Sequence, residues 1–414
     1  MSDIFDITII GGGPAGMMAA IVASESDKKI CLFEKNKFLG QKLLLTGKGR
    51  CNFTTAKNIR EIVTAFGKKG GFLYGALNRF SNQDLIDFFQ KRGIKSEEER
   101  GQRVFPKNGN AKTVINCLQR DLRKNKVKVL RNAQIVKVTK QEDFFKLFTG
   151  HKKDFYTKKL IIATGGKSYP ATGSTGDGYR FSKNLGHTIS PVMPALVPLV
   201  VRDPDIRDLS GLSLKNVRLH LLADRQEVMN LFGEMLFTHF GVSGPIVLQM
   251  SKTAFIQIRM KKRVSLKIDL KPALSEEKLK KRLQREMEKI GKKEYQNLLA
   301  TLLPKSLIPL VIKKTHIDQH RKVGSLTSNE KVKIVRFLKG FTFSVEKTMP
   351  IEQAIVTAGG VDIDEINSKT MESKIVPGLY FAGEVIGLEG PTGGFNLQKA
   401  FSTGWVAGRA AVAD

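Results

Sequence analysis

The stretch "DITIIGGGPAGMMAAIVAS", residues 6–24, constrains the fold of this chain more than any other. An apolar run at residues 7–10 leads into Gly11, Gly13 and Gly16, and a segment of small residues follows. This spacing predicts a buried strand, a tight turn and a helix. The first glycine forms the turn, the second lets the backbone approach a pyrophosphate, and the third lets the helix pack closely on the strand. Free N–H groups at the start of the helix favour binding of the phosphates.

A second buried strand, "KKICLFEK", ends at Glu34, which lies 18 residues after Gly16. A carboxylate at this position suits the two ribose hydroxyls of an adenosine and repels a 2′-phosphate. The glycine turn and this carboxylate together predict a dinucleotide site. The expected binding residues of this part of the chain are Gly11, Gly13, Ala15, Gly16, Glu34 and Lys35.

Two later stretches favour FAD over NAD. "KKLIIATGGKSYP", residues 158–170, reads as a buried strand that breaks at Ala163, Thr164 and Gly165, and "VPGLYFAGEV", residues 376–385, reads as another that ends in Gly383 and Glu384. Such returns bring the chain back to FAD in flavoproteins of the two-dinucleotide-binding type, where the acidic residue meets the ribityl chain. Since no second GxGxxG follows a strand, we expect NADH or NADPH to be a transient donor that visits the flavin directly.

The charge of the chain is strongly positive. Lys and Arg number 69 against 39 Asp and Glu, a formal net charge of +30, and residues 271–340 alone hold 18 basic and 7 acidic residues. Such an excess attracts polyanions, either nucleic acid or an anionic membrane surface. The alternatives are an ordinary solvated surface, or a lineage whose proteins are all basic.

Several classes of protein are disfavoured by the composition. No apolar run approaches the roughly 18 residues that a membrane span needs. The first residues, "MSDIFDITII", are acidic where a signal peptide would be basic. The three cysteines, Cys31, Cys51 and Cys117, are far apart and form no CxxC pair, so neither a disulfide framework nor a metal site is predicted. We expect a cytoplasmic protein without a bound metal, and no pattern indicates its oligomeric state.

Longer motifs extend over nearly the whole chain, from residue 11 to residue 408. They are "GGGPAG", "GQKLLLTGKGRCNFT", "RVFP", "ATGGKSYPATGSTGDGY", "GEMLFTHFGVSGP", "TAGGV" and "TMESKIVPGLYFAGEVIGLEGPTGGFNLQKAFSTGWVAG". With these motifs the sequence resembles the BaiN/RdsA-type flavoproteins, a family of NAD(P)/FAD-dependent oxidoreductases. One departure is Lys48, where the family commonly has a small residue.

The resemblance implies an α/β fold with a Rossmann-like FAD domain of the two-dinucleotide-binding type. This domain is discontinuous, with a β-barrel-like insertion and a small helical domain between its two parts. The expected ranges are 1–190 and 341–414 for the FAD domain, 191–273 for the barrel-like insertion and 274–340 for the basic helical domain. Local patterns agree: "SLKNVRLHLLA" and "RVSLKIDL" alternate like strands, and "SEEKLKKRLQREMEKI" reads as a helix that starts at Ser275. "TFSVEKTM" is expected to return as a strand toward the FAD domain.

The resemblance also gives a role to "KLLLTGKGRCNFTT", residues 42–55. In related flavoproteins the loop after the second strand passes along the flavin, whereas the alternative here is a tight structural turn. Gln41 and Lys42 are expected near the pyrophosphate and ribityl chain, and Gly47 lets the backbone approach the ring. A helix start near the C-terminus would favour the reduced, anionic flavin. The remaining expected cofactor contacts are Asn52, Val136, Gly394, Asn396 and Leu397.

Members of the family are implicated in reducing a C=C bond conjugated to a carbonyl. One branch resembles enone reductases of 3-oxo bile acids, and the other makes dihydrouridine in 23S ribosomal RNA. In both, hydride reaches the β-carbon, the carbonyl oxygen gains enolate charge, and an acid protonates the α-carbon. The charge of +30 favours uridine in 23S rRNA as the substrate. The alternatives are a small-molecule, steroid-like enone reductase, and a non-catalytic, electron-carrying flavoprotein bound to RNA or a membrane surface.

Four residues are candidates for the chemistry. Arg50 is a permanent cation that suits an enolate or the flavin N1/O2 edge, or else forms an ordinary ion pair. Cys51 is a candidate proton donor, since a free thiol has a pKa near 8.5, or else packs beneath the loop. His239, in a glycine-rich loop, can donate to a carbonyl or bind RNA, although a lone histidine is more often structural. Tyr169 can stack on a base or donate its hydroxyl hydrogen.

Overall fold

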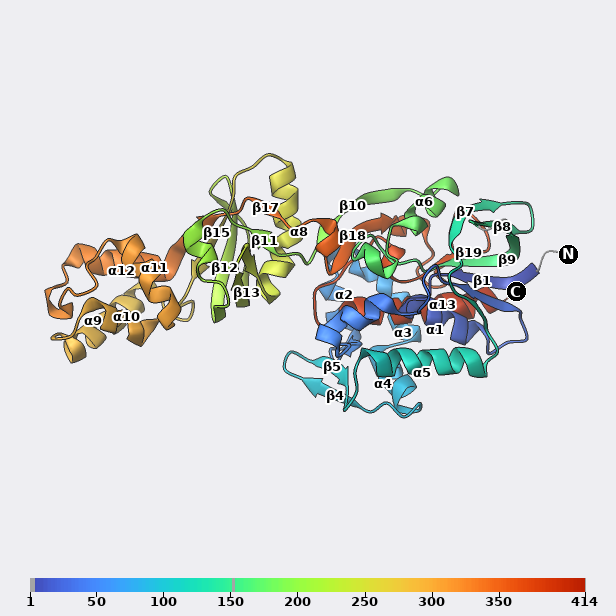
Figure 1. Ribbon diagram of the computed structural model, residues 1–414, viewed down its shortest axis with the longest axis horizontal. Helices are drawn as coiled ribbons and strands as arrows, with labels where there is room; N and C mark the ends of the chain where they lie inside the picture. The colour runs from blue at the N-terminus through green and yellow to red at the C-terminus, as the bar shows by residue number, and fades with distance from the viewer. Residues whose placement is uncertain (1–3, 151–152, 414) are drawn as a thin grey trace. The chain divides into compact units, whose positions relative to one another are not determined.

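The computed structural model describes residues 4–150 and 153–413 and divides into two compact units. The first unit combines the chain up to Ala195 with the chain from Ile351 onward, and the second is Leu196–Pro350. Figure 1 labels the elements of both. Each unit has its own hydrophobic core. Within the described residues, no helix is long and apolar enough to cross a membrane.

The first unit is built on a mixed seven-stranded sheet in the order β6-β2-β1-β9-β8-β7, with β19 also paired to β9. The strands β6, β2, β1, β9 and β19 run parallel, and β7 and β8 add an antiparallel edge. Since β2 is buried along its whole length, its continuous apolar run is typical of a strand covered on both faces. The strands are β1 Ile4–Ile10, β2 Ile30–Phe33, β6 Lys128–Leu130, β7 Ile135–Lys140, β8 Phe145–Thr149, β9 Asp154–Ile162 and β19 Leu379–Phe381.

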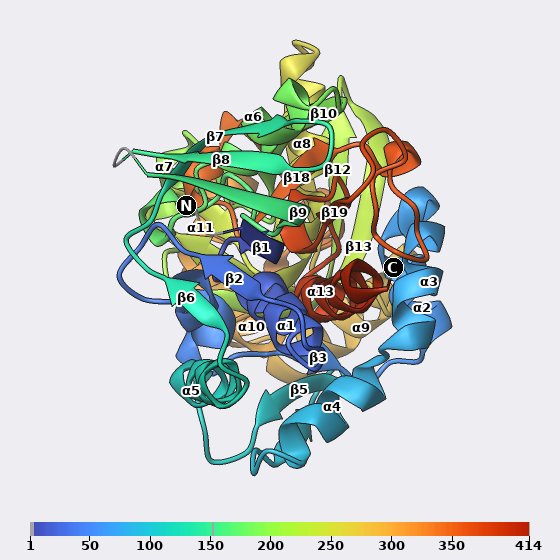
Figure 2. The ribbon, with the colours of Figure 1, turned by 90° about the vertical axis from the view of Figure 1, so that its right-hand side faces the viewer.

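Two helices from opposite ends of the chain pack together beside this sheet, α1 Pro14–Ala23 and α13 Phe395–Val412. Figure 2 shows them side by side. Glycine makes this close approach possible, because a Cβ at Gly404 would lie 2.3 Å from the backbone oxygen of Ala15 and one at Gly408 would lie 2.5 Å from that of Ala19. The C-terminal segment therefore packs against the first helix of the chain.

The first unit also contains further helices and small sheets. Its further helices are α2 Ile59–Ala65, α3 Tyr74–Arg79, α4 Asn82–Gln90, α5 Ala111–Lys124 and α6 Asp177–Asn184. Short 3-10 helices are η1 Gln41–Gly49, η2 Gly67–Leu73, η3 Pro170–Thr172, η6 Ile351–Gln353, η7 Ile363–Glu365 and η8 Gly383–Val385. Small sheets are formed by β3 Thr54–Thr55, β5 Arg103–Pro106 and β4 Ser96–Glu99, and by β10 Ile189–Ala195 with β18 Val356–Val361.

The second unit contains an antiparallel seven-stranded sheet in the order β16-β15-β12-β13-β14-β11-β17. The strands are β11 Leu199–Val200, β12 Ser213–Ala223, β13 Gln226–Thr238, β14 Gly241–Ser243, β15 Val264–Asp269, β16 Phe341–Ser344 and β17 Lys347–Thr348. Helix α8 Pro245–Arg259 packs on the sheet, and α7 Pro204–Arg207 precedes β12. The range that the resemblance implies, 341–414, puts residues 341–348 with the return strand and the second part of the FAD domain. Instead, ladder hydrogen bonds from β16 to β15 and from β17 to β11 place them in the second unit.

Helices fill the remainder of the second unit: α9 Glu276–Ile290, α10 Tyr295–Leu302, α11 Ile308–Thr315 and α12 Ser328–Gly340, with short η4 Lys305–Leu307 and η5 Val323–Ser325. Ser275 caps α9, because its side chain accepts a hydrogen bond from the backbone N–H of Lys278. Leu279, Leu283 and Met287 recur every four residues and are buried, so α9 turns its apolar face inward and its charged face outward.

Candidate active site

The glycine turn joins β1 to α1. Gly11 has a φ of +111°, and a Cβ there would lie 2.4 Å from the backbone oxygen of Ala163. A Cβ on Gly16 would lie 1.9 Å from the backbone oxygen of Gly11, so both positions require glycine. At Gly13, the N-cap of α1, a built Cβ would meet no described atom within 4 Å apart from its chain neighbours, and no described side chain caps the helix. A helix start without a side-chain cap suits an anion.

Glu34 lies beside this turn, directly after β2. Its Oε2 accepts a hydrogen bond from the backbone N–H of Gly12 at 2.9 Å, and its Oε1 accepts one from Asn36 at 2.8 Å. Burial raises the pKa of Glu34 above its ordinary value. The neighbouring Lys35 points elsewhere, since its Nζ binds Asp177 at 2.8 Å and the Thr175 hydroxyl at 2.6 Å. The structure thus holds the Glu34 carboxylate at the turn and commits Lys35 to an ion pair.

An ion pair between Lys42 and Glu384 links two of the predicted cofactor residues. Lys42 Nζ lies 2.7 Å from Glu384 Oε2 and also donates to the Ser168 hydroxyl at 2.5 Å. Glu384 accepts further hydrogen bonds from the backbone N–H groups of Gly166 at 3.3 Å and Thr357 at 2.9 Å. Burial alone would raise the pKa of Glu384, but Lys42, the backbone N–H of Thr357 and the charge of Lys399 together lower this pKa below its ordinary value. The carboxylate is therefore held in its ionised form.

The turn after β9 runs beside Glu384. The backbone N–H of Ala163 donates to Ile10 at 2.9 Å, which keeps the turn against the end of β1. Gly165 has a φ of +76°. The hydroxyl of Thr164 is buried and has no hydrogen-bond partner within the described part of the chain. The hydroxyl packs against α6, since a Cβ built on Gly178 would lie 2.1 Å from it.

The start of α13 is a second helix terminus without a side-chain cap among the described residues. Gly394 has a φ of +96°, and a Cβ there would lie 2.2 Å from the backbone oxygen of Thr54. The Asn396 side chain holds its own loop, since its Nδ2 donates to Gly390 at 2.8 Å and its Oδ1 accepts from the Gly390 N–H at 2.9 Å. Leu397 packs against the hydrophobic core. Any direct contact of this turn with a cofactor would thus come from its backbone.

The loop quoted at residues 42–55 forms η1 and the turn after it. Gly47 and Lys48 both have a φ of +57°, so the unusual Lys48 adopts a left-handed conformation. Asn52 stabilises the loop by donating to the backbone oxygens of Thr54 at 2.8 Å and Val104 at 3.0 Å. Gln41, at the start of η1, is partly buried. On the edge strand β7, Val136 is exposed.

Arg50 and Cys51 are neighbours in the chain but have different surroundings. The Arg50 guanidinium binds Glu99 at 2.5 Å and stacks 4.4 Å from the Phe105 ring centre, an arrangement that favours the ion-pair alternative. Cys51 is fully buried, and burial raises the pKa of its thiol to about 12. This burial agrees with the packing alternative, and a proton-donor role for Cys51 stays a prediction.

The other two chemical candidates lie in different units. Tyr169 precedes η3 in the first unit, is partly buried and has a φ of +51°, held by a backbone hydrogen bond to Glu352 at 3.1 Å. His239 lies between β13 and β14 in the second unit. It is exposed, and its ring meets Phe240 edge to face with 4.9 Å between the centres. For both side chains, a role in binding or reducing the substrate stays a prediction.

Three further residues were not singled out from the sequence. Ser168 and Thr357 belong to the hydrogen-bond cluster around Glu384, where the Thr357 hydroxyl also accepts from the backbone N–H of Ser168 at 3.1 Å. Lys399 on α13 is buried, and burial lowers the pKa of its amine to about 8. In the sequence, Lys399 could have been noticed as the lysine of the motif "NLQKAF", which lies within an apolar helix. No group of three or more metal-ligating side chains is present in the ranges the structure describes.

The residues present fit FAD. Two uncapped helix starts, the Glu34 carboxylate and the Glu384 cluster all belong to the first unit. This fold and this set of groups define a Rossmann-type flavoprotein oxidoreductase. Residues 5–410 match the family described as "HI0933-like protein Rossmann domain", and the chain belongs to that family. This match confirms the family resemblance that the sequence motifs indicate.

Known relatives cover almost the full length. The chain is 32% identical over 98% of both chains to the 3-dehydro-bile acid delta(4,6)-reductase of Clostridium scindens. It is also 32% identical, over 98% of both chains, to the ribosomal RNA dihydrouridine synthase of Haemophilus influenzae. Among solved structures, the 3-ketosteroid-delta4-(5alpha)-dehydrogenase of Rhodococcus jostii aligns over 99% of this chain and 97% of its own, with a TM-score of 0.55 and 12% identity, which shows a shared fold. Together they support an FAD-dependent oxidoreductase.

Proposed function

We propose that this protein reduces uridine to dihydrouridine in 23S ribosomal RNA, with FAD as resident cofactor and NADH or NADPH as electron source. A first unit that fits FAD supports the chemistry, and a full-length relative that is a ribosomal RNA dihydrouridine synthase supports the substrate. The observation that carries the choice of RNA is the net charge of +30, since a small enone needs no such electrostatic field. A cytoplasmic location follows from this substrate.

The roles of the chain's residues follow from their positions. The start of α1 would hold the pyrophosphate and Glu34 the adenosine ribose, while Lys42 and Glu384 would hold the ribityl chain. When bound, FAD supplies hydride to the conjugated carbon–carbon bond. Tyr169 stays proposed to stack on a base or donate its hydroxyl hydrogen. His239 stays proposed to donate to a carbonyl or bind RNA, and the Arg50 guanidinium is engaged by Glu99.

The second unit would serve substrate binding. We propose that it comprises a barrel-like part and a helical part, close to the ranges 191–273 and 274–340 expected from the sequence. The seven-stranded sheet carries the first part and helices α9 to α12 carry the second. Inserting such a module into a flavoprotein leaves the cofactor site intact and adds specificity elsewhere.

An anaerobic assay tests the proposal. Purified protein is reduced with NADPH or NADH and mixed with unmodified 23S rRNA, and dihydrouridine is measured by mass spectrometry after nuclease digestion. We expect reoxidation of the reduced enzyme together with dihydrouridine formation. Reduced enzyme that stays reduced in the presence of rRNA would contradict the proposal.

A second candidate, a small-molecule enone reductase, is favoured by the bile acid reductase relative of equal identity. The same anaerobic assay with a 3-oxo-4-ene steroid separates it, since that candidate predicts reoxidation by the steroid and none by rRNA. Reoxidation by neither substrate would support a non-catalytic, electron-carrying flavoprotein.

A further inference from the structure

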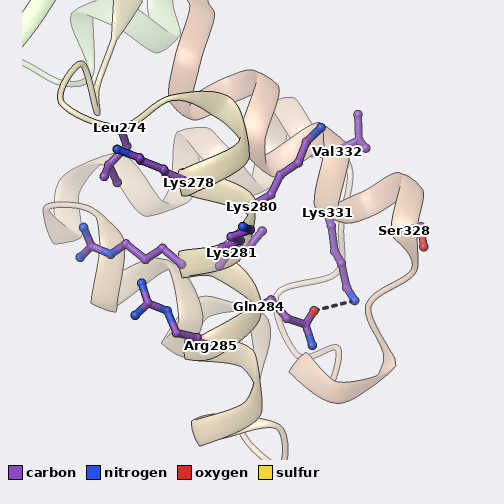
Figure 3. A pocket seen from close by; sticks show the side chains of 11 residues that line it. Leu274, Lys278, Lys280, Lys281, Gln284, Arg285, Ser328, Lys331 and Val332 are labelled. Carbon is purple, nitrogen blue, oxygen red and sulfur yellow. Dashed lines mark hydrogen bonds between the residues drawn. The ribbon is translucent and has the colours of Figure 1, made fainter.

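A hollow between α9 and α12 in the second unit is lined by positive charge. Its volume is about 960 Å³, and it is shown in Figure 3. None of the residues that line the hollow is acidic, and those that are not cations are apolar or neutral. The cations that line it are Lys278, Lys280, Lys281, Arg282, Arg285 and Lys331.

The helical period explains why these cations gather. Lys278, Lys281, Arg282 and Arg285 follow the spacing i, i+3, i+4 and i+7, which places them on one face of α9 over about 10 Å. Lys331 adds a charge from α12, where it donates to the Gln284 side chain at 3.3 Å. These five residues are here called the α9 basic face.

The cations of the α9 basic face form no ion pair within the described residues, since none of the five has a carboxylate within salt-bridge distance there. Elsewhere in the same unit cations are paired, for example Lys313 with Asp205 at 2.6 Å. The like charges repel one another, so the face gains most from a ligand that carries several negative charges in a row.

The surroundings favour a phosphate backbone over a membrane. A helix that lies on a bilayer inserts apolar side chains beside its cations. Between Met260 and Ile355, no large apolar side chain of the described chain is exposed, and Leu279, Leu283 and Met287 of α9 are buried in the core. A nucleic-acid backbone needs only the charges and the hollow.

We propose that the α9 basic face binds the phosphate backbone of the substrate RNA. The inference rests on the proposed function, because it names where that function holds its substrate. Phosphate contacts position an RNA without reading its sequence, so the face supplies affinity and orientation while recognition of one uridine belongs to the active site.

The test compares two variants of the full-length, FAD-loaded protein with equal charge loss. The face variant carries Lys278→Gln, Lys281→Gln, Arg282→Gln and Arg285→Gln. The probe is an unmodified transcript of 23S rRNA, titrated without NADH or NADPH over a range of salt concentrations. The affinity should fall at least tenfold, and the slope of log affinity against log salt should become shallower by about 3, since each lost phosphate contact removes about 0.7–0.9.

The matched control removes four exposed cations of the first unit: Lys91→Gln, Lys95→Gln, Arg123→Gln and Lys124→Gln. It should keep RNA affinity within about twofold, because it leaves the α9 basic face intact. A third variant, Lys278→Arg with Lys281→Arg, should bind RNA like the wild type, since it keeps the charge. FAD absorbance and circular dichroism check that each variant is folded.

The outcomes are distinct. Unchanged affinity and slope in the face variant would overturn the proposal, as would an equal loss in the control. Vesicles containing phosphatidylserine serve as a second probe, and binding to them that the face variant alone loses, with RNA binding intact, would assign the face to a membrane instead. RNA held through this face but never reduced would refute the proposed function and leave the docking surface standing.

Discussion

Lys42 and Glu384 lie 342 residues apart in the sequence, yet Lys42 Nζ and Glu384 Oε2 are 2.7 Å apart. Their side chains are only 22% and 17% exposed. The same carboxylate accepts hydrogen bonds from Ser168 and Thr357, so it joins η1, the turn after β9 and β18. This pair connects the two parts of the discontinuous first unit at the place where we propose that the ribityl chain binds.

Breaking this pair from one side should be more harmful than removing it entirely. Lys42→Met leaves a largely buried carboxylate without its cation, and we expect the free energy of unfolding to fall by about 2 kcal/mol. The double variant Lys42→Met with Glu384→Gln should recover part of that loss, because no uncompensated charge remains. Urea unfolding of the FAD-free protein measures both. Equal losses in the single and double variants would contradict a coupled pair.

The pair also predicts a dependence of stability on pH. The pKa of Glu384 is lowered from its ordinary value near 4.5, so the unfolded chain takes up this proton at a higher pH than the folded one. The stabilisation is therefore complete above about pH 4.5 and is lost as the pH falls below it, toward the folded pKa. Urea unfolding between pH 3 and 7 should show a smaller acid loss for Glu384→Gln than for wild type. Parallel curves would exclude this contribution.

Glu34 should determine how tightly FAD is held. Glu34→Arg removes the carboxylate proposed to bind the adenosine ribose and places a cation beside the glycine turn. We expect FAD affinity to fall by about 10- to 100-fold, the equivalent of a lost charged hydrogen-bond pair. Titration of the FAD-free protein with FAD, followed by fluorescence, measures it. The control Glu142→Arg, at an exposed position on the β7–β8 turn, should bind FAD normally, and an equal loss there would point to a general charge effect.

Cys51 should be chemically silent in the folded protein. Its thiol is buried with a pKa raised to about 12, so little thiolate forms near neutral pH and no reagent reaches it. Iodoacetamide at pH 7.5 should label Cys51 only after denaturation, as read by peptide mass spectrometry. Cys51→Ala should retain dihydrouridine formation. A variant that kept its FAD but lost turnover would restore Cys51 as a proton donor.

Elements that depend on local patterns could be predicted from the sequence. The glycine turn, the strand before Glu34 and the helix after Ser275 each depend on residues within one or two turns of chain, where spacing and capping decide the structure. The helix boundary at α9 accordingly lies one residue after the expected cap. Residues 341–348 show the limit, because an alternating pattern indicates a strand but not the sheet in which it pairs.

Partners that are distant in sequence could not be predicted. Arg50 had two possible roles, and the choice depends on Glu99, which the β4–β5 hairpin brings to its guanidinium. The choice between the two roles of Cys51 likewise depends on the burial of its thiol, which no local pattern reveals. The cluster of Ser168 and Thr357 around Glu384 combines three distant segments. Long-range contacts of this kind require the folded topology.

The most direct test of the account is the dihydrouridine content of 23S rRNA in cells that lack this protein. The rRNA is purified from a gene-deletion strain, its parent and a complemented strain, then digested and quantified by mass spectrometry. The account predicts that the deletion strain loses dihydrouridine at one position and that the wild-type gene restores it, whereas a gene carrying Glu34→Arg restores less. An unchanged dihydrouridine content in the deletion strain would contradict the central claim.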